Sequence, residues 1–211
     1  MTVLNSLIEE HRLISRLIGA LELYSRRVGH GVDADPAHLR GFVTALTELG
    51  DHLHHEKEER ILLPFLSRHG FDWNAEPLPL IRQEHRHELY LLGVLQQAGE
   101  RLVEWSAEER RHVAAAAAAL CEFQRRHHQT ENEQLFPAAE QRLSPSALLQ
   151  LERELEAFDA VPAHRQRRAA ALPLATRLIE LYIPKEALPS VVGRETAGGA
   201  PDSACVAGVR R

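Results

Sequence analysis

The chain has 211 residues, of which 44% are hydrophobic and 26% are charged, the composition of an ordinary folded protein with one sizeable core. This composition excludes a wholly disordered or collagen-like chain. The net charge of −5 disfavours binding to nucleic acid or to an anionic membrane surface. The longest apolar run, 113–121, is far shorter than the ~20 residues that span a bilayer, so no membrane segment is expected.

Cysteine usage bears on the compartment in which the protein works. The two cysteines, Cys121 and Cys205, are too few for a disulfide framework, and Cys205 lies in a Gly-rich stretch near the C-terminus. We therefore expect a reducing, cytoplasmic location.

Apolar residues recur at three- and four-residue steps along most of the chain, which predicts an all-α protein. The predicted helices cover 2–28, 36–68, 80–102, 106–143, 145–159 and 163–182. Asp35, Ser106 and Ser144 are typical N-cap residues at three of these starts. No sustained alternation of apolar and polar residues competes with this pattern.

The first four helices are expected to form an antiparallel up-down four-helix bundle over 1–143, followed by two accessory helices over 144–188 and a flexible tail over 189–211. The accessory helices could cover the bundle or form an oligomer face, and the sequence leaves this open. Within them, the basic stretch 164–168 is expected to face solvent.

Two prolines fall inside predicted helices. Pro64 lies in the second helix and Pro137 in the fourth. Because proline removes a backbone hydrogen bond and crowds the preceding turn, a kink or break is expected at each.

An internal repeat aligns the two halves of the predicted bundle. Glu10-His11-Arg12 matches Glu84-His85-Arg86 at an offset of 74, and His54-His55-Glu56-Lys57-Glu58 matches His127-His128-Gln129-Thr130-Glu131 at an offset of 73. In both halves a proline follows the last glutamate by six residues. Each half therefore carries a lone histidine, a His-x-x-x-Glu pair and a proline in the same order.

The His-x-x-x-Glu spacing places an imidazole and a carboxylate on one face of a helix, where both can reach the same ion. In the first half, three pairs fit this spacing: His52/Glu56, His54/Glu58 and His55/Glu59. Only His127/Glu131 fits in the second half, and its repeat partner is His54/Glu58. A single pair of this kind is most often a solvated ion pair, whereas the matched set indicates a metal site.

The repeat thus predicts six inward-facing metal ligands at a carboxylate-bridged dinuclear centre: His11, His54, Glu58, His85, His127 and Glu131. Imidazole and carboxylate without thiolate favour iron or manganese over structural zinc.

The other histidines receive different predictions. Five are expected in solvent: His30, His38, His69, His112 and His164. His52 and His87 are expected at the surface or in supporting contacts. His55, His128 and Glu59 directly follow ligands, so they are expected to point about 100° away and to make supporting hydrogen bonds.

These motifs resemble those of the hemerythrin-like (HHE) proteins. The resemblance rests on the two Glu-His-Arg triplets and on both His-x-x-x-Glu segments with their Leu-x-Pro sequences, and it covers about residues 4–143. It implies a four-helix bundle that holds two non-haem irons bridged by carboxylates. On this resemblance the iron ligands are His11, His54, Glu58, His85, His127 and Glu131.

The resemblance narrows the function without fixing it. Oxygen-carrying hemerythrins have a further histidine four residues after the third-helix histidine, and here that position is Leu89. The ligand set is instead similar to that of bacterial di-iron iron-sulfur-repair proteins and of HHE proteins linked to iron, oxygen, nitric oxide or peroxide. We expect both irons to keep an open position, with Leu89 pointing towards one of them.

Two functional classes follow from this expectation. In the first, the protein is a binding, sensing or reactive di-iron protein whose ligand is oxygen, peroxide or nitric oxide. In the alternative, it is a di-iron oxidase or oxygenase that acts on an organic substrate. The alternative requires a substrate pocket beside the metals.

Overall fold

The computed structural model describes residues 3–32, 35–101 and 104–183, which are almost entirely helical and form no strand. The α-helices are α1 (Asn5–Gly29), α2 (Pro36–Leu46), α3 (Leu63–Arg68), α4 (Leu78–Gly99), α5 (Ala107–Thr130), α6 (Phe136–Arg142), α7 (Pro145–Ala160) and α8 (Pro162–Tyr182). Three π-helical segments join them: η1 (Thr47–His55), η2 (Glu58–Leu62) and η3 (Glu131–Leu135).

All six predicted helices are confirmed. The second corresponds to α2 through α3 and the fourth to α5 through α6. The predicted tail, 189–211, lies outside the described residues. Within the described part of the chain, no helix is long and apolar enough to cross a membrane.

The helix starts follow the predicted cap chemistry. The Asp35 side chain accepts a hydrogen bond from the Ala37 N–H at 2.8 Å. Ser106 forms a complete capping box with Glu109, and the Ser144 hydroxyl accepts from the Ala147 N–H. Each of these bonds satisfies a backbone donor that the first helical turn leaves without a partner.

The predicted interruptions at the prolines take the form of π-helical turns. Segment η2 ends directly before α3, which carries Pro64, and η3 ends directly before α6, which carries Pro137. Proline has no N–H to donate to the preceding turn, and the wider π-helical hydrogen bonding accommodates that loss. The first residue of each of these two segments is a predicted glutamate ligand, Glu58 in η2 and Glu131 in η3.

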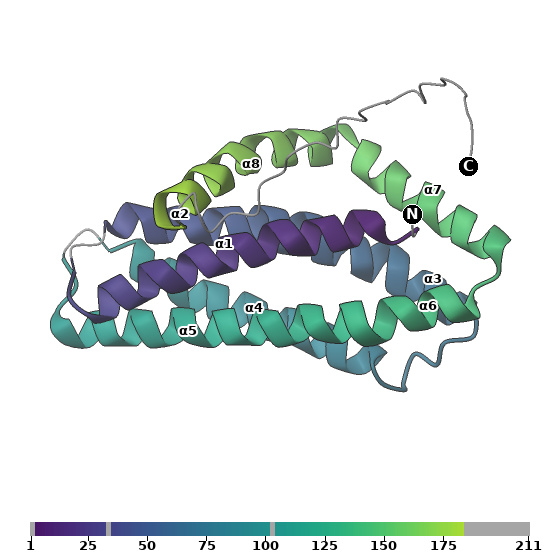
Figure 1. Cartoon of the computed structure of the whole chain (residues 1–211), viewed down its shortest axis with the longest axis horizontal. Helices are drawn as coiled ribbons and strands as arrows, with labels where there is room; N and C mark the ends of the chain where they lie inside the picture. The colour runs from purple at the N-terminus through teal and green to yellow at the C-terminus, as the bar shows by residue number, and fades with distance from the viewer. Residues whose placement is uncertain (1–2, 33–34, 102–103, 184–211) are drawn as a thin grey trace, which may run out of the picture.

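Four long helical stretches surround a common interior. Helix α1 packs along α5, α5 packs along α4, and α4 packs along α2, while α1 also contacts α2 and η1. Figure 1 shows α1 and α5 side by side along the long axis of the molecule.

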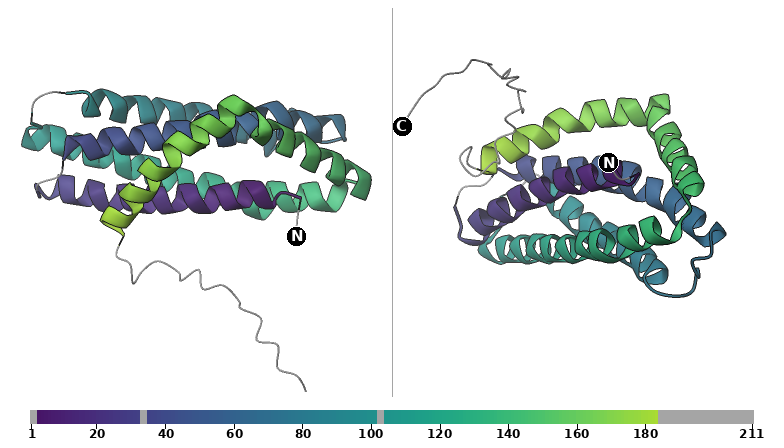
Figure 2. Two further views of the ribbon diagram at one scale, coloured as in Figure 1. Left: turned by 90° about the horizontal axis from the view of Figure 1, so that it is seen from above. Right: turned by 45° about the vertical axis from the view of Figure 1, so that its right-hand side comes forward.

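The last two helices cover one side of this arrangement. Helix α8 packs on α1, α2 and η1, and α7 packs on η2 and α8. Figure 2 shows α8 crossing over the long helices at an angle, with α7 leading from the end of α6 up to α8. The structure therefore shows the covering role, which the sequence left open.

The apolar core is divided into two clusters with a polar layer between them. On α1, Leu7 belongs to one cluster and Ile14 to the other, and His11 lies between them. On α4, His85 likewise lies between Ile81 and Leu91. The apolar packing on both sides fixes the helices that carry the polar layer.

Candidate metal centre

The six predicted ligands come from all four long helical stretches and meet in the interior. His11 is on α1, His54 in η1, Glu58 in η2, His85 on α4, His127 on α5 and Glu131 in η3. All six are buried, with at most 2% of their surface exposed. They form two groups in which the possible ligand atoms lie within 4.8 Å of one another. His11 and His54 belong to the first group, His85 and His127 to the second, and Glu58 and Glu131 to both.

In the first group, two imidazoles and two carboxylates face one another. The Nε2 atoms of His11 and His54 lie 2.7 Å apart. His11 Nε2 lies 3.1 Å from Glu131 Oε2, and His54 Nε2 lies 3.7 Å from Glu58 Oε1. Two neighbouring ligands with metal bonds of about 2.1 Å are themselves roughly 3 Å apart, so this spacing suits a shared ion.

In the second group, both imidazoles again turn Nε2 towards the glutamates. His85 Nε2 lies 3.4 Å from Glu58 Oε2, and His127 Nε2 lies 3.5 Å from Glu131 Oε2. Each glutamate therefore contacts one histidine of each group, and Glu58 uses a different oxygen for each. A carboxylate between two groups of imidazoles is placed to bridge two ions.

Each of these four histidines donates a hydrogen bond from Nδ1 to an outer partner. The pairs are His11 with Asn132 Oδ1 at 3.0 Å, His54 with Glu10 Oε2 at 3.1 Å, His85 with Glu59 Oε1 at 2.8 Å, and His127 with Glu84 Oε2 at 2.9 Å. A proton on Nδ1 leaves the lone pair of Nε2 free, and the bond fixes the orientation of the ring. All four imidazoles are thus prepared to bind an ion through Nε2.

The outer partners follow the internal repeat. Glu10 and Glu84 directly precede the two lone histidines, while Glu59 and Asn132 directly follow the two glutamate ligands. Of these four partners only Glu59 was expected to make a supporting contact, and the roles of Glu10, Glu84 and Asn132 were not expected. The repeat contained the signal, because the Glu-His-Arg triplets match at their first residue as well as at the histidine.

The two carboxylates shared by both groups lack hydrogen-bond donors. Among the residues that the structure describes, none donates a hydrogen bond to either oxygen of Glu58 or of Glu131. A buried carboxylate without donors is unfavourable unless a positive charge stands beside it. A cation between the two carboxylates would supply that charge.

The pKa shifts in the cluster have the same origin. Burial alone would raise the pKa of Glu131, but the charge of His127 and the close contact and charge of His11 hold it well below its ordinary value. Burial alone would lower the pKa of His85, yet Glu58 and Glu59 raise it to about 10. The carboxylates therefore attract positive charge, which protons supply in the metal-free protein.

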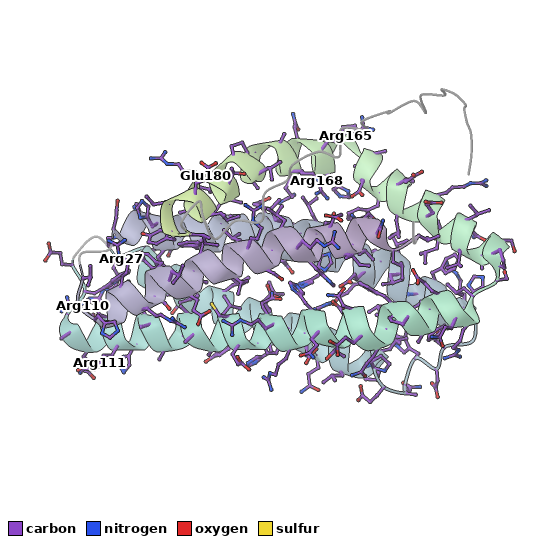
Figure 3. All side chains as sticks on the ribbon, viewed as in Figure 1. Arg27, Arg110, Arg111, Arg165, Arg168 and Glu180 are labelled. Carbon is purple, nitrogen blue, oxygen red and sulfur yellow. The ribbon has the colours of Figure 1, made fainter. Side chains whose placement is uncertain are left out.

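A buried ion-pair network connects the centre to the covering helices. The Lys57 Nζ lies 2.7 Å from Glu10 Oε1 and 2.7 Å from Asp159 Oδ1, and Arg168 of α8 also pairs with Glu10. Figure 3 labels Arg168 on α8. Burial would raise the pKa of Glu10, but His54 and Lys57 hold it well below its ordinary value.

This network corrects one prediction. The basic stretch 164–168 does not simply face solvent, because Arg168 reaches Glu10 and Arg167 pairs with Glu48 at 2.5 Å. The two arginines are adjacent on α8, which packs on α1 and η1, so their long side chains reach carboxylates on both.

His55 and His128 do not point away from the ligands, as was expected, but lie in the interior with them. His55 is 2% exposed and stacks on His85 with ring centroids 4.0 Å apart, while His128 is 4% exposed and stacks on His11 at 4.1 Å. Because helices enclose the site on all sides, a turn of about 100° along the helix still directs each side chain towards a neighbouring helix that carries ligands.

Of the five histidines expected in solvent, His30, His69 and His112 are exposed, whereas His38 and His164 are only partly exposed. His38 Nδ1 lies 2.6 Å from the Tyr182 hydroxyl, and the Nδ1 atoms of His69 and His164 donate to backbone carbonyls at 2.9 and 2.7 Å. The His38 and His164 bonds link α8 to α2 and to α7, the His69 bond stays within the end of α3, and none of them involves the centre. His52 and His87 are outside the cluster, in agreement with the surface role expected for them.

Leu89 does not point into the centre, and the residue beside it does. Leu89 is 45% exposed, whereas Glu88 is 1% exposed and its Oε2 lies 3.4 Å from His55 Nε2. The buried residues of α4 continue from His85 through Glu88 to Leu91 and Leu92, so Leu89 is at the edge of the buried stripe. Burial raises the pKa of Glu88 to about 7.

A surface cavity adjoins the second group of ligands. Its volume is about 320 Å³, and His85, His55, Glu59 and Leu89 are among the residues that line it. The rest of the lining consists of polar or charged side chains: Asp51, His52, Glu56, Arg60 and Arg86. The cavity therefore brings solvent close to the His85 side of the cluster.

The fold and the site define an all-helical protein whose interior holds His and Glu groups that can bind a metal ion. Comparisons with protein-family models, with curated proteins and with solved structures find no match for this chain. Its function is therefore argued from its own residues.

Proposed function

We propose that this chain is a cytoplasmic, hemerythrin-like, non-haem di-iron protein that binds or reacts with oxygen, peroxide or nitric oxide. In this proposal its four long helical stretches are the antiparallel four-helix bundle of that family. The observation that carries the proposal is the pair of ligand groups that share Glu58 and Glu131. Two histidines for each group and two shared carboxylates are a natural ligand set for two ions.

The donor set supports iron as the metal. Among the described residues, the cluster offers imidazole nitrogens and carboxylate oxygens and no thiolate, because the buried Cys121 lies elsewhere and contacts the Ile18 carbonyl. Such donors suit iron and manganese better than structural zinc. When bound, a pair of irons would supply reversible redox chemistry and an affinity for small oxidising ligands.

The residues of the chain prepare the site in two ways. The outer partners Asn132, Glu10, Glu59 and Glu84 fix the four imidazole rings, so little reorganisation is needed when metal binds. The apolar clusters on both sides keep bulk water out of the interior, which strengthens every charge interaction within it.

The surface cavity beside His85 supports the proposal that the ligand is a small molecule. Leu89 stands at its rim and His85 forms part of its inner wall, so a molecule such as peroxide has a short route from solvent. An oxidase or oxygenase that acts on an organic substrate is the second candidate. Substrate pockets commonly have volumes of about 300–1,000 Å³, and this cavity, at about 320 Å³, is at the lower end of that range, so the small-ligand function is the better supported.

Metal analysis of purified protein, reconstituted anaerobically with excess iron, tests the centre. We expect about two irons per chain. His54→Ala and Glu131→Ala should each lose metal, while His112→Ala, which changes an exposed histidine, should not. A single metal per chain, a preference for zinc, or equal loss in all three variants would contradict the dinuclear proposal.

Stopped-flow absorbance of the reduced, iron-loaded protein tests the function. Mixing with oxygen, peroxide or nitric oxide should change the spectrum rapidly for at least one of the three, with a rate that is linear in ligand concentration. An iron-loaded protein that reacts with none of them would refute the proposed function.

A further inference from the structure

We propose that His55 and His128 are also metal ligands, so that each ion is bound by three imidazoles. This inference rests on the proposed dinuclear centre and adds to the six ligands that the repeat predicts. Its basis is that the possible ligand atoms of His128, His11 and His54 lie within 4.8 Å of one another, as do those of His55, His85 and His127.

Both histidines have nitrogens without hydrogen-bond partners in the interior. In the described part of the chain, neither His128 Nε2 nor either nitrogen of His55 makes a hydrogen bond. Buried polar atoms are nearly always satisfied, and each exception needs a physical reason. Because Glu58 and Glu131, which also lack donors, lie in the same interior, a bound ion accounts for all of these atoms together.

Each of the two side chains also has one nitrogen beside an outer residue and one without a partner. His128 Nδ1 lies 3.2 Å from the Ser15 hydroxyl, which leaves Nε2 without a partner. His55 Nε2 lies 3.4 Å from Glu88 Oε2, which leaves Nδ1. His85 and His127 have the same division, with an outer partner at Nδ1 and an Nε2 that makes no hydrogen bond.

The two positions are equivalent in the two halves of the molecule. His55 and His128 occupy the same place in the repeat, and each stacks on the lone histidine of one half. The interplanar angle is 15° for His55 with His85 and 19° for His128 with His11. Each proposed set of three imidazoles thus contains a stacked pair, with one ring from each half, and a third ring nearly perpendicular to the lone histidine of the pair, His54 at 73° and His127 at 80°.

The added ligands change the expected chemistry. Three imidazoles and two bridging carboxylates give each metal five protein donors, which nearly completes an octahedral set. Such ions are held more tightly and have less room for an external ligand than ions with two imidazoles each. Each metal would then keep one of its six positions for an external ligand.

X-ray absorption spectroscopy of the iron-loaded protein tests this inference, because scattering from imidazole rings reports how many bind each iron. We expect three per iron in the native protein and two in the double variant His55→Phe/His128→Phe, whose rings keep a similar size without a nitrogen. Transfer of iron to a chelator should be about 10- to 100-fold faster in the double variant. His87→Phe, an exposed change two residues from His85, is the matched control and should alter neither quantity.

The outcomes separate this inference from the proposed function. Two irons with two imidazoles each in the native protein would overturn the inference and leave the dinuclear centre standing. A native protein that binds no iron would overturn both. The number of imidazoles per iron in the native protein decides the question even if the double variant fails to fold. If the double variant folds and this number does not change, the inference is also overturned.

Discussion

Lys57 offers a direct test of the ion-pair network that joins α7 and α8 to the candidate metal centre. Its ammonium group is completely buried and stands between Glu10 and Asp159. Glu10 in turn accepts the hydrogen bond from His54. Lys57→Met keeps most of the side-chain volume and removes the charge.

The expected loss of stability can be estimated from the structure. Removing one partner of a buried ion pair costs about 3–5 kcal/mol, since it leaves the other charge buried and uncompensated. Arg168 still pairs with Glu10, and the Asp159 side chain is 33% exposed, so we expect a value at the lower end, about 3 kcal/mol. For a chain of this length that corresponds to a fall in Tm of roughly 6–12 °C.

Urea unfolding followed by circular dichroism measures this loss. Arg60→Met is the matched control, because Arg60 pairs with Glu56 at the surface and its side chain is 66% exposed. The control should lose less than about 1 kcal/mol. If Lys57→Met is as stable as the control, the network contributes no net stability and the argument from burial is wrong.

Three further predictions concern the centre itself. Glu84→Ala should weaken metal binding about 10- to 100-fold in a competition with chelator, because His127 loses the partner that fixes its ring, whereas the exposed Glu122→Ala should not. Metal-free protein should melt at a lower temperature than loaded protein, since the carboxylates of Glu58 and Glu131 then lack a cation between them, and superimposable melts would contradict a buried site. The raised pKa of Glu88 means that stability present below its ordinary pKa of 4.5 is lost as pH rises to about 7. In metal-free protein, Glu88→Gln should reduce this fall in the free energy of unfolding by up to about 3 kcal/mol, as measured by urea unfolding at several pH values. If the variant and the native protein show the same pH dependence, Glu88 is not the group responsible.

The helices and the inward-facing ligands could be predicted because both leave a pattern in the sequence itself: apolar periodicity for the helices and the internal repeat for the ligands. Apolar periodicity and cap residues determine where helices form, and their positions match the structure closely. The repeat selected His54 and Glu58 from three candidate pairs, and the structure brings these two together with His11, His85, His127 and Glu131. Whether metal binds there stays a prediction.

What could not be predicted depends on how helices meet. Spacing along one helix does not reveal that a second helix encloses His55, or that α8 brings Arg168 to Glu10. Spacing also does not show whether the residue three or four positions after His85 continues the buried face of α4. For this reason Leu89 was expected to point inward, whereas the buried residue is Glu88. Each of these errors concerns the direction of a side chain relative to a neighbouring helix.

The surroundings of the centre depart from the symmetry of its ligands. On one side, Lys57 and Arg168 pair with Glu10, the partner of His54, under the cover of α7 and α8. Residue Thr130, the repeat counterpart of Lys57, is a partly exposed threonine whose hydroxyl bonds its own helix. On the other side, His85 borders a surface cavity. Two metals with equivalent protein ligands would therefore differ in access, and a small ligand arriving from solvent would meet the His85 side first.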